Sequence, residues 1–438
     1  MRPSATDMAT PKRPESARKP ITTFGEGHLV AVPRAWLLAI TALLVAPWLI
    51  AAGLYMRPPA RGIAGSLSVH STGPSQPASA GPWGRLTVVP VVVSPPLEYV
   101  AADWGRSQEP DAWYFPGTSA ELLEAFLVST GLSTEQVARL RASVHPQPNI
   151  RGLVMTPDTE LVRSLSHEVR ARLYGQLAKS PLNFDQSNSF RFLGKSSEDW
   201  LGGTAISRET RRLVEPLIYR DGEFLNFADP EVIRAAVPDP AELRRLAKVL
   251  LRQATVLVRL SINQDSEVDA LADYWGRGGR RLDLRPLLES VVGAGPDRSI
   301  DIVHLLPTFA RHHLYRYPKV STADYAKPLL ANCLWTALNF FRAEPDDRFL
   351  DVNVALETLR RDYYVVEHGF QLGDVIGFVD DEGDLFHVAV YLADDLVFTK
   401  NGTSPMAPWT IVSTEYLKGY YRRHADDMRL IYHRRNDL

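Results

Sequence analysis

Residues 373–402 read GDVIGFVDDEGDLFHVAVYLADDLVFTKNG, and this stretch decides the fold expected for the C-terminal part of the chain. Three short runs of alternating or β-branched apolar residues are separated by turns rich in Asp and Gly. This pattern predicts an antiparallel β-meander, in which neighbouring strands are joined by tight turns. We expect one strand to end at Val379, a second to span Phe386–Leu392 with His387 at its head, and a third to span Leu396–Thr399.

The only cysteine of the chain, Cys333, precedes this meander in the stretch ANCLWTALNFF (331–341). Apolar residues recur there at helical spacing and Asn332 is a favourable N-cap residue, so Cys333 is expected on the first turn of a helix. The backbone N–H groups and the dipole at a helix N-terminus favour a thiolate, which is the nucleophilic form of cysteine. Taken alone, a free cysteine is more often a small buried hydrophobic residue.

A helix that presents cysteine and a sheet that presents histidine predict a specific chemistry. In nucleophilic cysteine catalysis the imidazole accepts the thiol proton, and a further polar side chain orients the ring. Cys333 and His387 are therefore the predicted catalytic pair. A second histidine, His368, ranks below His387 because it precedes a turn instead of heading a strand. Asp374 is expected to brace the turn into the first strand and to have no role in proton transfer.

The order of these motifs resembles the NlpC/P60 family of papain-like cysteine peptidases. The resemblance lies in the cysteine-bearing helix, in Leu372-Gly373-Asp374-Val375, and in the His-Val-x-Val-Tyr motif at 387–391, and it covers residues 325–438. It implies a papain-like α+β fold and the cleavage of amide bonds in bacterial cell-wall stem peptides. The chain departs from the family at the nucleophile, where Asp-Cys-Ser-Gly is replaced by Asn-Cys-Leu-Trp (332–335). The larger side chains would reshape the substrate groove.

Two residues are candidates for the side chain that orients His387. Alignment with the family from His387 onward places Thr399 in this role. Asn401 lies two residues further along the strand, on the same face, and is favoured as the better orienting group. Lys400 points to the opposite face and suits the role poorly.

Residues 35–55 (AWLLAITALLVAPWLIAAGLY) form a run of 21 residues without a charged side chain. This length can cross about 30 Å of hydrocarbon, and aromatic residues near both ends suit anchoring at the membrane surface. Six basic residues precede the run, so the N-terminus is expected in the cytoplasm and the later domains outside the inner (cytoplasmic) membrane, in the periplasm. A cleaved signal peptide is the alternative, although its apolar region is normally shorter, about 7–15 residues.

The middle of the chain predicts mainly helices. Ser133 and Gln136 form a capping box, as do Thr118 and Glu121, and each box opens an amphipathic helix. Further helices are expected over 160–178, 207–217, 230–236, 241–254, 266–274 and 284–292. Residues 86–93 predict an edge strand because of their proline, and residues 255–262 predict a second strand.

Composition excludes some classes of protein. The formal net charge of the 438 residues is −2, which argues against a nucleic-acid-binding protein. A lone cysteine cannot form an internal disulfide, which fits a working thiol. No metal or organic cofactor is implied: His304, His312 and His313 lack the spacing of a zinc site, and Arg277–Arg281 lacks the ending of a phosphate-binding loop.

The sequence thus predicts an α+β chain of five segments. These are a disordered cytoplasmic tail (1–34), a single transmembrane helix (35–55), a Pro/Gly/Ser-rich linker (56–85), a mainly α-helical domain (86–318) and an NlpC/P60-like domain (319–438). In the last, the cysteine-bearing helix packs on an antiparallel sheet. The expected function is that of a membrane-anchored cysteine peptidase or amidase with a peptide or cell-wall substrate.

Two other functions remain open. The first is a thiol acyltransferase that uses the same Cys333–His387 pair, which would be favoured if Trp335, Phe340 and Phe341 line an apolar groove. The second is a non-catalytic tethered scaffold, in which Cys333 is buried and the helical domain makes the contacts.

Overall fold

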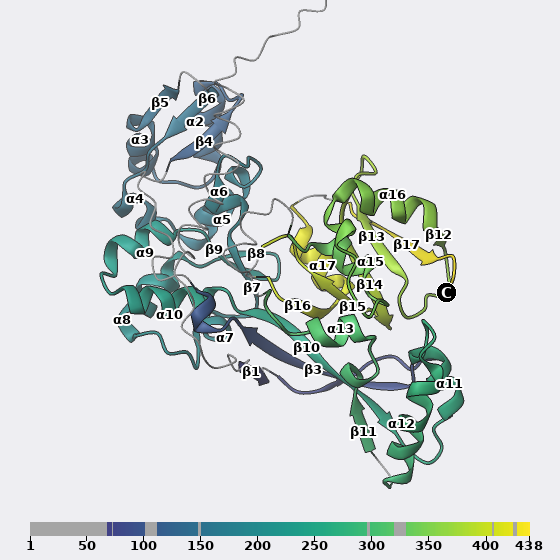
Figure 1. The fold of residues 1–438 in the computed structure, drawn as a ribbon. Coiled ribbons are helices and arrows are strands. Elements are labelled where there is room, and N and C mark those ends of the chain that lie inside the picture. The colour runs from purple at the N-terminus through teal and green to yellow at the C-terminus, as the bar shows by residue number, and fades with distance from the viewer. Residues whose placement is uncertain are drawn as a thin grey trace, which may run out of the picture. The chain divides into compact units, whose positions relative to one another are not determined.

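Antiparallel sheets form the frame of the chain (Figure 1). The computed structural model describes residues 68–71, 73–100, 112–147, 150–295, 298–318, 330–404, 407–423 and 427–438. Four sheets and the helices packed on them make an α+β fold.

The C-terminal sheet has six strands in the order β12-β17-β13-β14-β15-β16. The predicted meander is confirmed, because β13, β14 and β15 are consecutive neighbours and pair antiparallel. The last strand, β17, lies inside the sheet, between β12 and β13. The bounds are β12 Tyr363–Val366, β13 Val375–Val379, β14 Leu385–Ala393, β15 Leu396–Lys400, β16 Trp409–Ser413 and β17 Arg429–Arg435.

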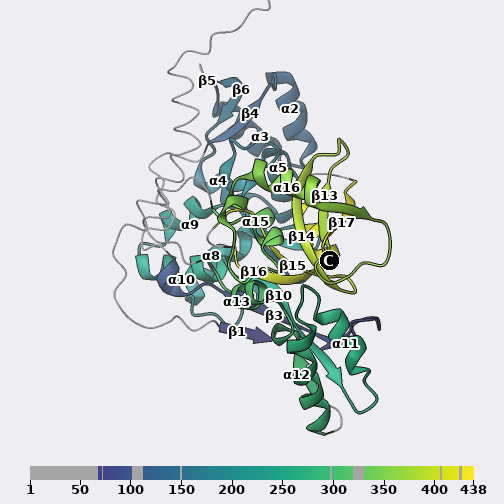
Figure 2. The same ribbon diagram turned by 45° about the vertical axis from the view of Figure 1, so that its right-hand side comes forward.

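Helices cover this sheet, and every residue of β13 and β15 is buried. Helix α15 (Cys333–Leu338) packs against β14 and β15 and contacts α16 (Val352–Asp362). Both views show α15 beside these strands (Figures 1 and 2). Helix α17 (Thr414–Tyr421) contributes side chains to a separate apolar cluster that contains the alternate residues of β13 and β14. The two sets of alternating side chains therefore pack into two different cores.

Helices account for more of residues 86–318 than strands do, but the prediction of a mainly helical domain left out the sheets among them. Three further sheets lie there, in the strand orders β1-β3-β10-β11 (with β2 also on β3), β4-β6-β5 and β7-β9-β8. Most of these strands have only two to six residues, so a period of two is hard to read from their sequences. The bounds are β1 Ser68–Ser71, β2 Gln76–Pro77, β3 Arg85–Ser94, β4 Trp113–Pro116, β5 Val144–Gln147, β6 Ile150–Met155, β7 Phe190–Leu193, β8 Tyr219–Asp221, β9 Phe224–Phe227, β10 Gln253–Ile262 and β11 Arg298–Asp301.

Strand β3 is the predicted edge strand, but it lies between β1 and β10. Its Pro90 faces Val256 of β10. On its other side, β2 pairs with Thr87–Val88 and β1 with Val91–Ser94, so Pro90 falls between the two. A residue without an N–H group is tolerated where one side has no partner strand. The described part of the predicted 56–85 linker contains β1 and β2.

The helices of the middle region begin at the caps expected from the sequence in several cases. Ser133 and Gln136 form the predicted capping box of α3. The helix predicted over 160–178 is divided, because Ser166 caps a new helix after α4. The bounds are α2 Ala120–Ser129, α3 Thr134–Ala142, α4 Thr159–Ser164, α5 His167–Leu177, α6 Phe184–Ser187, α7 Ser197–Leu201, α8 Arg208–Val214, α9 Pro230–Ala236, α10 Pro240–Leu250, α11 Val268–Trp275, α12 Arg281–Gly293 and α13 Thr308–His313, with short 3₁₀ helices η1 Leu97–Tyr99, η2 Glu215–Leu217, η3 Ile302–His304 and η4 Asp347–Leu350.

The predicted transmembrane helix also needs correction. Within the residues that the structure describes, each helix is too short or too polar to cross a bilayer. Residues 35–55, to which the prediction referred, lie outside the described residues. The structure therefore does not show the membrane helix that was part of the predicted fold class.

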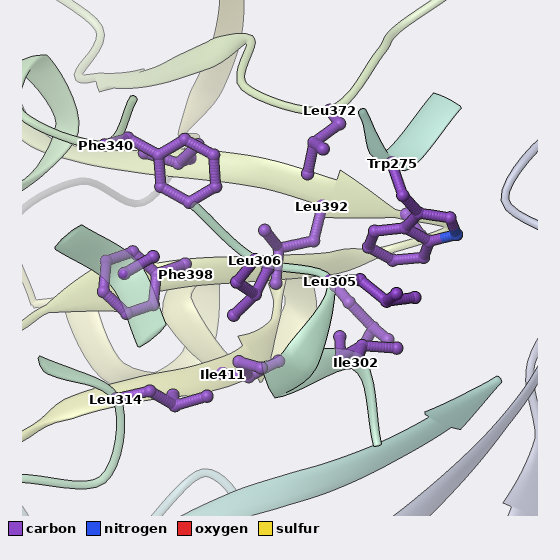
Figure 3. Close-up of a cluster of buried hydrophobic side chains, with 14 of the residues drawn as sticks. Trp275, Ile302, Leu305, Leu306, Leu314, Phe340, Leu372, Leu392, Phe398 and Ile411 are labelled. Carbon is purple, nitrogen blue, oxygen red and sulfur yellow. The ribbon is translucent and has the colours of Figure 1, made fainter. Parts of the chain in front are cut away.

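One hydrophobic cluster joins the C-terminal sheet to the β3–β10 sheet (Figure 3). Leu392 and Phe398 of the C-terminal sheet lie in the same cluster as Trp275, Leu305 and Leu306. These side chains come from both sides of the predicted domain boundary at residue 318. The described residues of the two predicted domains thus share a core.

Candidate functional site

Cys333 is the first residue of α15, as predicted. The side chain of Asn332 accepts a hydrogen bond from the backbone N–H of Trp335 at 2.9 Å and so caps the helix. The apolar face of α15, which includes Leu334 and Trp335, is buried in the cluster that contains alternate residues of β14 and β15. Packing and capping together fix the position of the cysteine against these strands.

The thiol of Cys333 lies in a mostly desolvated place. Burial raises its pKa above the ordinary value. It outweighs the groups that lower the pKa, which are the backbone N–H groups of Val388, Leu334 and Cys333 itself and the charge of Lys400. The residue as a whole remains partly exposed. The net direction is opposite to the one expected from a helix N-terminus alone, because desolvation disfavours the thiolate.

Lys400 is a buried cation close to this thiol. It is 0% exposed, and its Nζ donates to the carbonyl oxygens of Gly402 and Ser404 at 2.9 Å each. Burial lowers its pKa to about 7, and the charge of Cys333 acts in the opposite direction. A buried lysine is rare unless it is paired or has a function.

Lys400 was not among the predicted site residues. It lies on the face opposite Thr399, as predicted, but nothing in the sequence indicated that the thiol lies near that face. The alternation of side chains along β15 could have indicated this position. Leu396 and Phe398 share a strand face with Lys400, and both pack in the cluster that contains α15.

His387 is buried near the start of β14, and its side chain is hydrogen-bonded to that of Thr399. Its Nε2 lies 3.0 Å from the Oγ1 of Thr399, and that hydroxyl donates to the carbonyl oxygen of Val388 at 3.3 Å. A hydroxyl has one hydrogen, so when Thr399 donates to this carbonyl it accepts from Nε2–H. This network assigns the tautomer with the proton on Nε2, which makes Nδ1 the acceptor nitrogen. The ring also stacks on Tyr421, with centroids 4.4 Å apart.

The structure thus brings Thr399 to His387, and not Asn401, which was favoured. The Oδ1 of Asn401 accepts a hydrogen bond from the hydroxyl of Tyr421 at 3.4 Å. Asn401 therefore contacts Tyr421, and it is the Tyr421 ring that stacks on the imidazole.

The predicted Cys333–His387 pair remains a prediction. The thiol lies at the backbone of Val388, the residue directly after His387. The imidazole shares a strand face with Ala389, which packs in the cluster that contains α17, whereas Val388 packs with α15. Tyr421, whose ring stacks on the imidazole, interacts electrostatically with Cys333, so the thiol and the imidazole lie near the same residues at the head of β14.

The other polar candidates have structural surroundings. Asp374 is 1% exposed and forms an ion pair with Arg434, which fits the structural role expected for it. His368 is exposed. The Nδ1 atom of His313 lies 2.8 Å from the carbonyl oxygen of Phe309, and the imidazole stacks on the Phe309 ring. Within the described ranges, no group of histidine, cysteine and carboxylate side chains has the arrangement of a metal site.

The chain matches no known protein family, no curated protein and no solved structure.

Proposed function

We propose that the C-terminal sheet and its helices form a cysteine peptidase or amidase, with Cys333 as the nucleophile. The observation that carries the proposal is the surroundings of the thiol. A buried lysine and the strand that carries a hydrogen-bonded histidine both lie next to the only cysteine of the chain. Buried titratable groups that perturb one another are typical of functional sites.

The mechanism would be acyl transfer to water. His387 accepts the thiol proton at Nδ1, and the Cys333 sulfur attacks the carbonyl carbon of an amide. The imidazolium then gives this proton to the leaving amine as the C–N bond breaks, which leaves a thioester. Water, deprotonated by His387, attacks the thioester, and the products are a carboxylic acid and the restored thiol. The backbone N–H of Cys333 would supply one oxyanion donor.

Lys400 would favour the ionised state of the cysteine. A thiolate and an ammonium stabilise each other most where water is excluded. This effect matters here because burial raises the pKa of the thiol. Thr399 would hold the imidazole in the tautomer that can accept the thiol proton.

The substrate class comes from the resemblance to NlpC/P60 domains and is a cell-wall stem peptide. An apolar groove lined by Trp335, Phe340 and Phe341 would favour the acyltransferase alternative. Trp335 and Phe340 are instead buried in the core, so this support for the alternative is absent.

Alkylation and turnover with the full chain test this proposal. We expect iodoacetamide to label Cys333, and cell-wall stem peptides to be cleaved by the wild type but not by Cys333→Ser. His387→Ala should shift the pH profile of alkylation to higher pH and abolish turnover. His368→Ala changes an exposed histidine of the same module and serves as the matched control. An unchanged alkylation profile in a folded His387→Ala protein would show that the pair is wrong.

A further inference from the structure

One end of the β3–β10–β11 sheet is polar on one of its faces. Strands β3 and β10 pair antiparallel, with Arg85 opposite Ser261 and Thr87 opposite Arg259. Strand β11 continues the first row, because Ser299 lies opposite Ser261. Directly opposed residues point to the same side of a sheet, so all five share one face. The alternate residues between them are buried in the core: Leu86, Leu260 and Ile300.

The four side chains on β3 and β10 form a square of hydrogen-bond donors. The two arginines occupy diagonal corners, which lie about 7–8 Å apart in an antiparallel pair, and hydroxyls occupy the other two. In the described part of the chain, neither Arg85 nor Arg259 has an ion-pair partner. Asp301 lies opposite Arg259, but its Oδ1 accepts from the backbone N–H of Val303 at 2.9 Å and caps η3.

The four residues of this square help to line a cavity of about 760 Å³. Arg298 and Ser299 of β11 extend the lining. The loop between β10 and α11 contributes two carboxylates, Asp265 and Glu267. Donors thus line the sheet side of the cavity and acceptors line the loop side. None of the lining residues belongs to the Cys333 site.

We propose that this cavity binds the phosphate ester of a small polyhydroxylated molecule. A phosphate dianion has two charges and several acceptor oxygens, which match two guanidinium groups and their neighbouring hydroxyls. A carboxylate, with one charge and two oxygens, is satisfied by a single arginine. The cavity is larger than one inorganic anion requires. The carboxylates of Asp265 and Glu267 can accept hydrogen bonds from the hydroxyl groups of the molecule that carries the phosphate.

Calorimetric titration of the full chain with glucose 6-phosphate, glucose and inorganic phosphate tests the site. We expect the ester to bind more tightly than inorganic phosphate, and glucose not to bind at millimolar concentration. Arg85→Gln and Arg259→Gln should each weaken ester binding by about tenfold or more, because each removes charge-assisted hydrogen bonds. Both arginines are exposed, so the variants should keep the melting temperature of the wild type.

Arg208→Gln is the matched control, because it removes the same charge from an exposed position on α8. It should leave ester binding unchanged. Three results would overturn the proposal: no binding of the ester to the wild type, an ester no tighter than inorganic phosphate, or equal weakening by Arg208→Gln.

Discussion

The Nε2 atom of His387 lies 3.0 Å from the Oγ1 atom of Thr399, across two adjacent strands of the C-terminal sheet. The same hydroxyl lies 3.3 Å from the carbonyl oxygen of Val388, so all three groups are satisfied when Thr399 donates there and accepts from the ring. In that arrangement the Nε2 atom of the imidazole carries the proton. The contact also ties the head of β14 to the end of β15.

Thr399→Val should impair the site more than Asn401→Ala. Valine keeps the shape of threonine but leaves the ring without the acceptor that fixes its tautomer. One neutral hydrogen bond is worth about 1 kcal/mol, so the rate of Cys333 alkylation at neutral pH should fall about fivefold. Asn401→Ala reaches the ring only through Tyr421 and should change that rate less than twofold. Thr399→Ser keeps the hydroxyl and should restore the rate. A larger loss in Asn401→Ala would contradict this assignment.

Local signals in the sequence predicted the elements around the site but not their partners. The turns at 380–383 and 394–395 define the meander, and Asn332 defines the start of α15, because turn and cap preferences act over a few residues. Hydrogen bonds between strands depend on the register, which no local pattern determines. For that reason Thr399 and Asn401, on one strand face, could not be distinguished from sequence.

The environment of the thiol could not be predicted for a related reason. A cap and a helix dipole are local, and they suggested a thiolate. Desolvation depends on everything that packs around the sulfur, and here it is the largest effect on its pKa. The same holds for Lys400, whose burial comes from the packing of α15, β15 and Trp409. The short strands of the middle region were missed because their pairing is also non-local.

Lys400 should make stability depend on pH. Its pKa of about 7 in the folded chain lies below the ordinary value of 10.5. Between these values the unfolded chain binds more protons than the folded chain, so the free energy of unfolding rises with pH across this window. Below about pH 7 both states are protonated and the destabilisation by the buried charge is fully present.

Lys400→Met removes this group and keeps most of its apolar stem. The difference in unfolding free energy between wild type and variant, measured by urea titration, should shift in favour of the wild type from pH 7 to pH 10. Lys418→Met, at a more exposed lysine on α17, should show no such trend. A flat difference for Lys400→Met would mean that the lysine keeps its ordinary pKa in the folded chain and stays protonated across this range.

Asp374→Asn should destabilise the chain without changing the chemistry of the thiol. Arg434 donates to both carboxylate oxygens, at 2.8 and 2.7 Å, and the backbone N–H of Gln371 donates to Oδ2 at 2.8 Å. Breaking a buried pair leaves one charge without its partner, so we expect a loss of about 3 kcal/mol in the free energy of unfolding. Asp381→Asn, at the exposed hairpin tip, should stay within about 0.5 kcal/mol. A folded Asp374→Asn protein with an altered alkylation profile at Cys333 would show a direct role in the site.

The turn at Gly373, just before β13, packs against Phe341, which follows the end of helix α15. Gly373 has a φ of 92°, and a Cβ added there would collide with the ring of Phe341. Gly369 is the matched control, because its φ of 68° is also left-handed but a Cβ there would meet nothing within 4 Å. Gly369→Ala should therefore report backbone strain alone, about 1–2 kcal/mol.

Gly373→Ala adds overpacking to that strain. Overpacking should lower the free energy of unfolding by about a further 1–3 kcal/mol. Denaturant titration of both variants separates the two effects. If Phe341 must move, the alkylation rate of Cys333 should also change in Gly373→Ala and stay constant in Gly369→Ala. Equal destabilisation by the two substitutions would show that the Phe341 ring can give way freely, and that the turn and α15 are not coupled through it.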